Sequence, residues 1–288
     1  MGKSVSATPP SLAGLFGPES VSWKVDREAA LLLGGGRALL LQLAHPGVAR
    51  GVADHSDYRD HAFRRLNRTL ELSLALVFGT ATEARAAAAQ INHRHAAVRG
   101  NGYSALDPEL LLWVHSTLID STITTYETYV GHLPRREWER YYDEGKRTGA
   151  LLGIPARRFP PGLGDFEAYF GCMLQTELEV GPLARELARH VLRPLPARAF
   201  WPVEAVTAGL LPESLRRAYG LPWGVAERSA YELSRRVLPR LIAVLPPHLR
   251  LVPPARQAYR RVGTFGPPPP AGGGRRSTSG PPSRPTSR

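Results

Sequence analysis

The sequence predicts an all-α protein, in which a single helical bundle is flanked by irregular ends. From about Val25 to about Arg261, apolar residues recur at helical spacing, and few runs alternate between apolar and polar residues. Glycine, proline and capping side chains divide this region into segments of helical length. The three glycines at 34–36 lack the spacing of a dinucleotide-binding loop. We therefore expect one helical domain over residues 21–262, after a Pro/Gly/Ser-rich lead-in at 1–20.

The first half of the predicted domain contains five helical segments with clear boundaries. Thr80 is followed three positions later by Glu83, which is the arrangement of a capping box. Asp26 and Asp107 are typical N-cap residues, and Pro108 suits the first helical position. Glycine or proline then ends each segment. We expect helices within residues 26–35, 36–46, 61–79, 80–100 and 106–131.

The second half of the chain is divided by proline and glycine in the same way. Its predicted helical segments are residues 134–153, 164–180, 182–194, 211–220 and 226–246. Residues 263–288 are almost entirely proline, glycine, serine, threonine and arginine. Such a segment cannot bury enough apolar area to fold, so we expect a disordered tail.

The single cysteine, Cys172, restricts the chemistry that the 288-residue chain can perform. It excludes a disulfide within the chain and a cysteine-based zinc or iron–sulfur site. The C-x-x-C-H signature of covalently attached haem is also absent. Any haem must therefore be held without covalent bonds.

The formal net charge of +12 favours anionic partners. The sequence contains no RRM, KH or zinc-finger pattern, so we expect no nucleic-acid partner. The N-terminus lacks the apolar core of a signal peptide, and no run reaches the ~18 apolar residues of a membrane span. We expect a cytoplasmic protein, and peripheral contact with a membrane stays open as an alternative.

The stretch "INHRHAAVRG", residues 91–100, places two histidines two positions apart on a predicted helix. Successive helical residues rotate by about 100°, so His93 and His95 point about 200° apart and cannot grip one metal ion together. His95 falls on an apolar stripe that includes Ala84, Ala88 and Ile91. Two interpretations remain open for His95: a core histidine bonded to a backbone carbonyl, or an axial haem ligand that a flat macrocycle can approach over small neighbours.

A second polar cluster is carried by the segment "RRLNRT". Arg65, Arg68 and Thr69 share one helical face, and the apolar continuation of the helix predicts that this face turns inward. The arginines would either pair with the nearby carboxylates Asp54, Asp57 and Glu71 or bind an anionic or oxygen-bearing ligand. His115 also faces inward on its own predicted helix.

Five segments together resemble a known family. They are "LLLQLAHPGVARGVADHS", "RRLNRT", "VFGTATEARAAAAQINHRHAAVRG", "YSALDPELLLWVHSTLIDS" and "YYDEGKRTGALLGIP". In order and spacing, over roughly residues 25–250, they resemble the bacterial oxygenase family named after MpaB, which includes the latex-clearing rubber oxygenases. The resemblance implies a globin-like helical core around a non-covalent b-type haem. It also implies a reaction in which O₂ cleaves carbon–carbon double bonds of isoprenoid chains.

The resemblance assigns roles to particular residues. It implies that His95 is the proximal iron ligand, and that Arg65 matches the arginine that opens the family's R-x-x-(K/R)-T segment. Arg68 stands where the rubber oxygenases carry a lysine that can cap the distal iron position. Arginine stays protonated and is a poor iron ligand, so we expect an open distal position. Thr69 matches the family threonine, and His115 is a cofactor-binding candidate of open role.

These features predict a haem b-dependent oxygenase that uses O₂ on a small, apolar and unsaturated substrate such as an isoprenoid. His95 would bind the iron, and Arg65, Arg68 and Thr69 would polarise O₂ or hold a haem propionate. Two alternatives belong to other classes. One is a non-catalytic or peroxidase-like haem protein, and the other is a cofactor-free helical binding protein with a basic surface.

Overall fold

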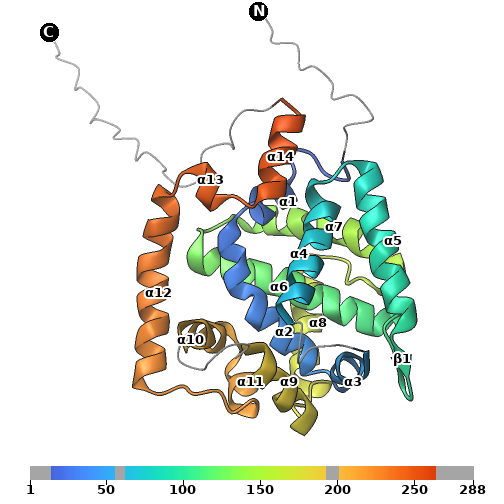
Figure 1. The fold of residues 1–288 in the computed structure, drawn as a ribbon, viewed down its shortest axis with the longest axis vertical. Coiled ribbons are helices and arrows are strands. Elements are labelled where there is room, and N and C mark those ends of the chain that lie inside the picture. Colours follow the sequence, from blue (N-terminus) through green and yellow to red (C-terminus); the bar gives the residue numbers. More distant parts are fainter. Residues whose placement is uncertain (1–13, 56–61, 193–200, 264–288) are drawn as a thin grey trace, which may run out of the picture.

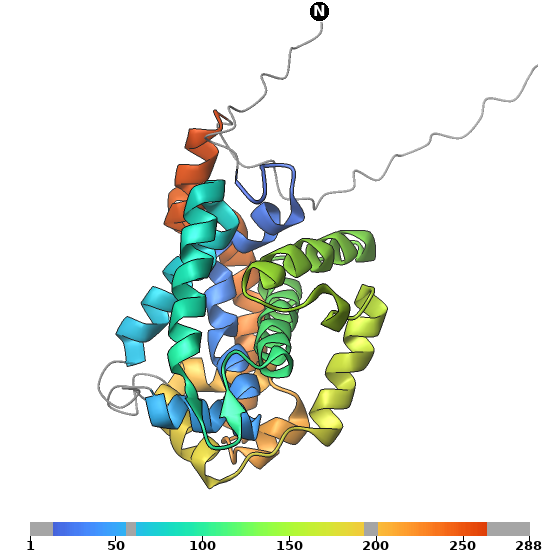
Figure 2. The same cartoon turned by 90° about the vertical axis from the view of Figure 1, so that its right-hand side faces the viewer.

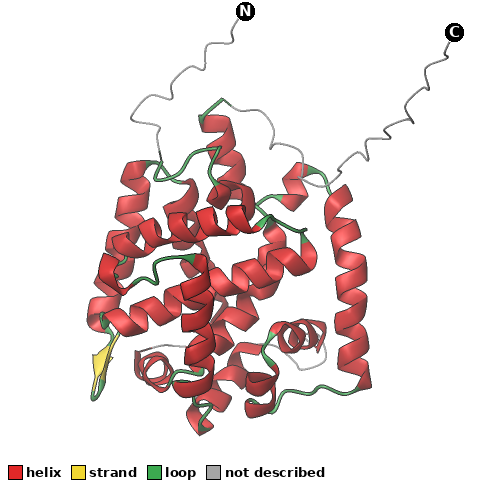
Figure 3. Ribbon diagram, turned by 180° about the vertical axis from the view of Figure 1, so that it is seen from behind, coloured by secondary structure: helices red, strands yellow, loops and turns green. Residues whose placement is uncertain are grey.

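The computed structural model describes residues 14–55, 62–192 and 201–263. The side chains of residues 62–67 and 191 fall outside that description. The described part is helical apart from one short hairpin, in which β1 (Arg99–Gly100) pairs antiparallel with β2 (Tyr103–Ser104) (Figure 3). The predicted all-α class is confirmed. The first 13 residues of the predicted lead-in, and residues 264–288 of the predicted tail, lie outside the described residues.

The helices follow one another in chain order with short connections. The first are α1 (Val21–Asp26), the 3₁₀ helix η1 (Ala29–Gly34), α2 (Gly35–Leu43), α3 (Pro46–His55), α4 (Ala62–Phe78), α5 (Ala81–Ala97) and α6 (Pro108–Tyr129). The next are α7 (Arg135–Leu151), the 3₁₀ helix η2 (Ala156–Arg158), α8 (Leu163–Thr176) and α9 (Pro182–Leu192). The last are α10 (Trp201–Leu210), α11 (Glu213–Ala218), α12 (Val225–Val244), α13 (Pro247–Arg250) and α14 (Pro253–Arg261).

Two predicted helix starts are confirmed in atomic detail. Thr80 Oγ1 accepts a hydrogen bond from Glu83 N at 3.2 Å, and Thr80 N donates to Glu83 Oε2 at 2.7 Å, which completes the capping box of α5. Asp107 accepts from Glu109 N at 2.8 Å, and Pro108 occupies the first position of α6.

The predicted helix at residues 26–35 is wrong in its start and its type. Helix α1 begins at Val21, capped by Ser20, and Asp26 is its last residue. Asp26 does not act as an N-cap, because its Oδ1 accepts a hydrogen bond from the Tyr141 hydroxyl at 2.9 Å. The segment that follows is the 3₁₀ helix η1. A tertiary partner on α7 therefore decides the role of this aspartate.

Helix α6 runs through the middle of the bundle and is buried along most of its length (Figures 1 and 2). Helices α2, α7, α12 and η1 all pack against it. Its Trp113 is fully buried and stacks on Phe170 of α8, with ring centroids 5.3 Å apart. This burial of large apolar side chains is the dominant favourable contribution to folding.

The glycines at 34–36 allow close packing of helices. A Cβ atom at Gly34 would collide with the Thr125 side chain of α6, and one at Gly36 would collide with the Thr207 side chain of α10. Arg37, the next residue, is buried and donates to Ser121 Oγ and to the Leu210 carbonyl, each at 2.9 Å. The glycine run therefore serves the contact of η1 and α2 with their neighbours.

A buried ionic cluster joins the two ends of the fold. Glu28 is 1% exposed, and its carboxylate accepts from Arg250 Nε at 2.7 Å and Nη2 at 3.0 Å, and from Arg27 Nε at 3.3 Å. Arg27 Nη1 also contacts the Tyr259 hydroxyl at 3.2 Å, and Val252 N donates to the Arg27 carbonyl at 2.9 Å. We call this cluster of Arg27, Glu28, Arg250 and Tyr259 the terminal clasp. It fixes the start of the bundle to α13 and α14.

Helices α4 and α5 form a hairpin, because only Gly79 and Thr80 separate them and they pack side by side. Near this link the hairpin is closed by buried Leu76, Ala87 and Ala88. Leu151 and Leu152, at the end of α7, pack on the same cluster. Within the described residues, no helix is both long enough and apolar enough to cross a bilayer.

Candidate functional site

The two histidines of α5 point in different directions, as the helical period predicts. His93 is exposed, whereas His95 is half-buried. On the face of His95, Ala84 and Ala88 are buried and Ile91 is half-buried. This face is therefore covered near the link to α4 and becomes more open toward the C-terminal end of α5.

One face of α4 likewise becomes more exposed with distance from the link to α5. Leu76 is buried, Leu72 is half-buried, and Arg68 and Thr69 are exposed. The expectation that this face turns inward is therefore wrong at Arg68 and Thr69. Because α4 and α5 run antiparallel, their exposed ends lie at the same end of the hairpin. We call this region, which carries Arg68, Thr69 and the His95 end of α5, the open end of the α4–α5 hairpin.

The imidazole of His95 lacks the hydrogen bond that a structural histidine would make. Its Nδ1 atom is buried and has no hydrogen-bond partner among the described residues. Burial lowers the pKa of His95 below its ordinary value, so the ring is neutral at pH 7. A neutral imidazole with an unpartnered nitrogen can act as a metal ligand.

Two further polar residues of α5, Asn92 and Arg94, lie beside His95. The sequence pattern alone did not single them out. Asn92 Nδ2 donates to the Leu151 carbonyl at 3.0 Å, but Asn92 Oδ1 and Arg94 Nη2 are buried without partners in the described part of the chain. Burial lowers the pKa of Arg94, and repulsion from the positive charge of Arg68 lowers it further. An anion between them would relieve this repulsion. Helical spacing could have found both residues, because they flank His95 on the wheel.

Arg65 lies on α4, but its side chain is outside the described residues. Asp54, one of the carboxylates considered as partners for the arginines, instead accepts a hydrogen bond from the Tyr103 hydroxyl at 2.5 Å. Asp57 is outside the described residues, and Glu71 is exposed. The role of Arg65 stays a prediction.

His115 is buried on α6 and contacts α7 and the loop after it. Its Nε2 bonds the Gly145 carbonyl at 2.9 Å, and its ring meets Phe159 edge-on, with centroids 6.2 Å apart. Burial lowers its pKa to about 4, so the ring is neutral at pH 7. The ring also faces Gly149, in the last turn of α7, and the same turn contacts Asn92 through Leu151. His115 is thus hydrogen-bonded, unlike His95, and its role as a cofactor ligand stays a prediction.

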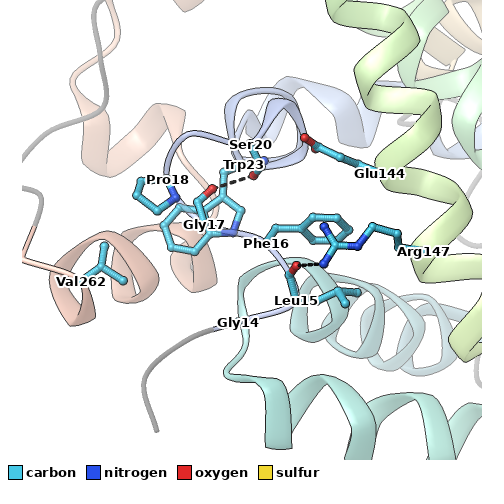
Figure 4. A pocket seen from close by; sticks show the side chains of 10 residues that line it. All are labelled: Gly14, Leu15, Phe16, Gly17, Pro18, Ser20, Trp23, Glu144, Arg147 and Val262. Carbon is cyan, nitrogen blue, oxygen red and sulfur yellow. Dashed lines mark hydrogen bonds between the residues drawn. The ribbon is translucent and has the colours of Figure 1, made fainter. Parts of the chain in front are cut away.

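Two cavities lie away from these residues. One, of about 260 Å³, is lined by seven residues between Gly14 and Trp23, by Glu144 and Arg147 of α7, and by Val262 (Figure 4). Its polar groups have protein partners: Glu144 accepts from the backbone and hydroxyl of Ser22, and Arg147 donates to the Leu15 carbonyl at 2.8 Å. The other, of about 290 Å³, is lined by residues of α6, α7 and α8. Neither contains a predicted site residue.

Asp26, whose carboxyl faces Tyr141 and Glu144, predicts a pH dependence of stability. Burial, with a smaller contribution from Glu144, raises its pKa from 3.8 to about 7. Between these values the folded protein keeps a proton that the unfolded chain loses, so the free energy of unfolding should fall by about 4 kcal/mol as the pH rises from about 4 to about 7. Urea titrations at several pH values will measure this fall.

The matched variants for this measurement are Asp26→Asn and Asp143→Asn. Asparagine at position 26 cannot ionise and still accepts from Tyr141, so Asp26→Asn should remove the fall. Asp143 is exposed and pairs with Lys146, so Asp143→Asn should retain it. An equal pH dependence in Asp26→Asn and the unmodified protein would contradict the assignment.

The donor set at the open end of the hairpin fits a metal that brings most of its own ligands. In the described ranges, no three histidine, cysteine, aspartate or glutamate side chains gather closely enough to hold a metal ion. A b-type haem needs only one protein ligand, because the porphyrin supplies four. His95 would be that ligand, and Arg68 and Arg94 would be cationic partners for the two propionates. The residues present therefore fit this group.

The chain is thus an all-α protein with a half-buried, unpartnered histidine on a helical hairpin. A family model described as the catalytic domain of the ER-bound oxygenase mpaB/B′ and rubber oxygenase matches residues 23–240. This range covers most of the chain and contains both helices of the hairpin. The chain belongs to this oxygenase family.

Two curated relatives are similar over most of their length. An uncharacterized protein of Mycobacterium bovis and an uncharacterized protein of Mycobacterium tuberculosis are each 30% identical to this chain over 229 residues. The alignment covers 73% of this chain and 88% of each relative. No solved structure matches the chain.

Proposed function

We propose that this protein is a haem b-dependent oxygenase that uses O₂ on an apolar, unsaturated substrate of the isoprenoid class. Membership of the oxygenase family supports the reaction type. The observation that supports haem as the cofactor is the state of the His95 imidazole, which is half-buried, neutral and unpartnered at Nδ1. Half-buried Leu72, Ile91 and Leu151 belong to one apolar cluster, and Ile91 precedes His95 by one helical turn, so this cluster would contact an apolar substrate.

Each residue at the open end of the hairpin has a distinct task in this proposal. His95 holds the iron and, because burial keeps it neutral, does so without first losing a proton. When bound, haem supplies the redox chemistry that makes O₂ reactive toward a double bond. Arg68 and Arg94 bind the propionate carboxylates and fix the orientation of the cofactor. The Thr69 hydroxyl would donate a hydrogen bond to O₂, and Arg65 of the same helix would supply a second polar group.

Arg68 stands at the position where, by the resemblance, the rubber oxygenases carry a lysine. A guanidinium stays protonated, so it has no lone pair to offer to iron. We therefore expect no side chain from this position to block access of O₂. The same charge is free to hold a carboxylate.

The arginine pair gives a direct test of the cofactor's orientation. The double variant Arg68→Gln/Arg94→Gln should weaken haem binding about tenfold, because two charge-assisted contacts to propionate are lost. Titration of the purified protein with hemin, followed by absorption, will measure the affinity. The control is Arg85→Gln, an exposed arginine on the same helix. Equal affinities for the double variant and the unmodified protein would exclude the propionate contact.

Catalysis is tested by O₂ consumption with an isoprenoid substrate such as squalene or short polyisoprene. The haem-supplemented protein should consume O₂ and release carbonyl products, which mass spectrometry will identify. A bound haem without O₂ consumption would favour the non-catalytic or peroxidase-like alternative. The absence of any Soret band after supplementation would favour the cofactor-free binding protein.

A further inference from the structure

The outer face of α12 exposes an unusual amount of apolar surface. Among the described residues, twelve large apolar side chains are exposed, and seven of them lie between Val225 and Leu249. Four form one stripe along the helix, because their spacing places them within about 80° of each other on the wheel. These residues, which we call the α12 stripe, are Leu233, Val237, Leu241 and Val244, with exposures of 62%, 39%, 51% and 77%.

The fold holds the α12 stripe outward. The opposite face of α12 packs on the bundle through Tyr231, Leu238 and Ile242. Tyr231 lies directly on Gly209 of α10, where a Cβ atom would collide with its ring. Helix α12 lies at the edge of the molecule opposite α5 (Figure 1). The stripe is therefore fixed at the surface of a well-packed helix.

The apolar surface continues beyond the end of α12. Leu245 and Leu249 are exposed at 37% and 59%, and Leu32 of η1, which contacts α13, is exposed at 53%. Exposed apolar patches that are bordered by polar residues commonly mark an interaction surface.

Arginine borders the stripe. Residues 225–250 contain five arginines and two glutamates, and both glutamates have partners within the helix. Glu232 pairs with Arg235 at 3.1 Å, and Glu227 caps the helix start by accepting from Gly224 N at 2.8 Å. Arg236 and Arg240 lie about 60° and 20° from Leu233 on the wheel and are exposed. Arg240 also donates to the Arg236 carbonyl, which leaves its charge at the surface.

We propose that the α12 stripe docks the protein on an anionic phospholipid surface. Apolar side chains would enter the boundary between headgroups and acyl chains, and the bordering arginines would meet lipid phosphates. A second copy of the chain is a poorer partner, because a symmetric contact would bring Arg236 and Arg240 against the same residues of the other copy. The proposal stands on α12 and is independent of the haem site.

The test is co-sedimentation of the full chain with vesicles. The protein should bind vesicles of equimolar phosphatidylcholine and phosphatidylglycerol more tightly than vesicles of phosphatidylcholine alone, and added salt should weaken the difference. The Leu233→Gln/Leu241→Gln variant should bind about tenfold more weakly, because two apolar side chains no longer enter the bilayer. The control, Leu106→Gln/Leu118→Gln, changes two other exposed leucines and should bind as the unmodified protein does.

A second pair of variants tests the contribution of the arginines that border the stripe. Arg236→Gln/Arg240→Gln should reduce binding to the anionic vesicles about tenfold and leave binding to phosphatidylcholine unchanged. Arg85→Gln/Arg136→Gln removes the same charge from exposed positions elsewhere and should have little effect. Circular dichroism of each variant will confirm that the helices are intact.

Three results would overturn the proposal. The first is failure of the unmodified protein to bind either kind of vesicle. The second is an equal loss of binding in the leucine variant and its control. The third is a dimer, detected by light scattering, that the Leu233→Gln/Leu241→Gln variant separates into monomers, because the stripe would then be the contact between copies.

Discussion

The His95→Ala variant is expected to lose haem, with an affinity at least about 100-fold below that of the unmodified protein. The proposed protein ligand to iron disappears, and His93, the other histidine of α5, is exposed on the other side of the helix and cannot replace it. Absorption spectra recorded after haem supplementation and gel filtration will show whether a Soret band is retained. The same spectra give the affinity when hemin is titrated.

The chain offers a closely matched control for this experiment. His93→Ala removes a histidine from the same turn of α5 and should keep the Soret band of the unmodified protein. Both variants introduce alanine, which favours the helix, so their circular dichroism should be unchanged. A Soret band that persists unaltered in His95→Ala would refute the ligand assignment. A loss in both variants would show that α5 tolerates no change there.

The Glu28→Gln variant should lower the free energy of unfolding by about 3–5 kcal/mol. Glu28 is buried in the terminal clasp, and its charge compensates the guanidinium groups of Arg27 and Arg250. Glutamine keeps the shape but removes the charge, so these arginines would lose their neutralising partner in a region of low dielectric. Urea denaturation followed by circular dichroism will measure the change at constant pH.

An exposed ion pair provides the comparison. Glu232→Gln breaks the pair with Arg235, whose side chains are 46% and 49% exposed, and should change the free energy of unfolding by only about 0–1 kcal/mol. Burial is the main difference between the two carboxylates. If both variants unfold at the same urea concentration, the terminal clasp contributes no more than a surface contact.

The sequence predicted those parts of the fold that depend on local contacts. The starts of α5 and α6 were predictable because Thr80, Glu83 and Asp107 bond the backbone within a few residues. The role of Asp26 was not, because its partner Tyr141 is 115 positions away. The short helices α3, α13 and α14 were not predicted either. Each begins with proline, and the sequence pattern places the end of a segment at the first of these prolines, Pro46.

The candidate site likewise has features that the sequence predicted and features that it did not. The separation of His93 and His95 follows from the helical period alone, and the structure confirms it. The missing partners of Asn92, Arg94 and His95 could not be predicted from α5, because they depend on what α4 and α7 place beside it. Exposure of Arg68 and Thr69 likewise depends on how far α5 covers α4.

The terminal clasp has a practical consequence for any attempt to shorten the protein. The family model ends at residue 240, but one of the two arginines that pair with Glu28 is Arg250, and the hydroxyl beside Arg27 belongs to Tyr259. A fragment trimmed to residues 23–240 would keep Glu28 but lose Arg250. The cooperative folding unit is thus longer than the segment that matches the catalytic domain, and a shortened version should retain all of α14.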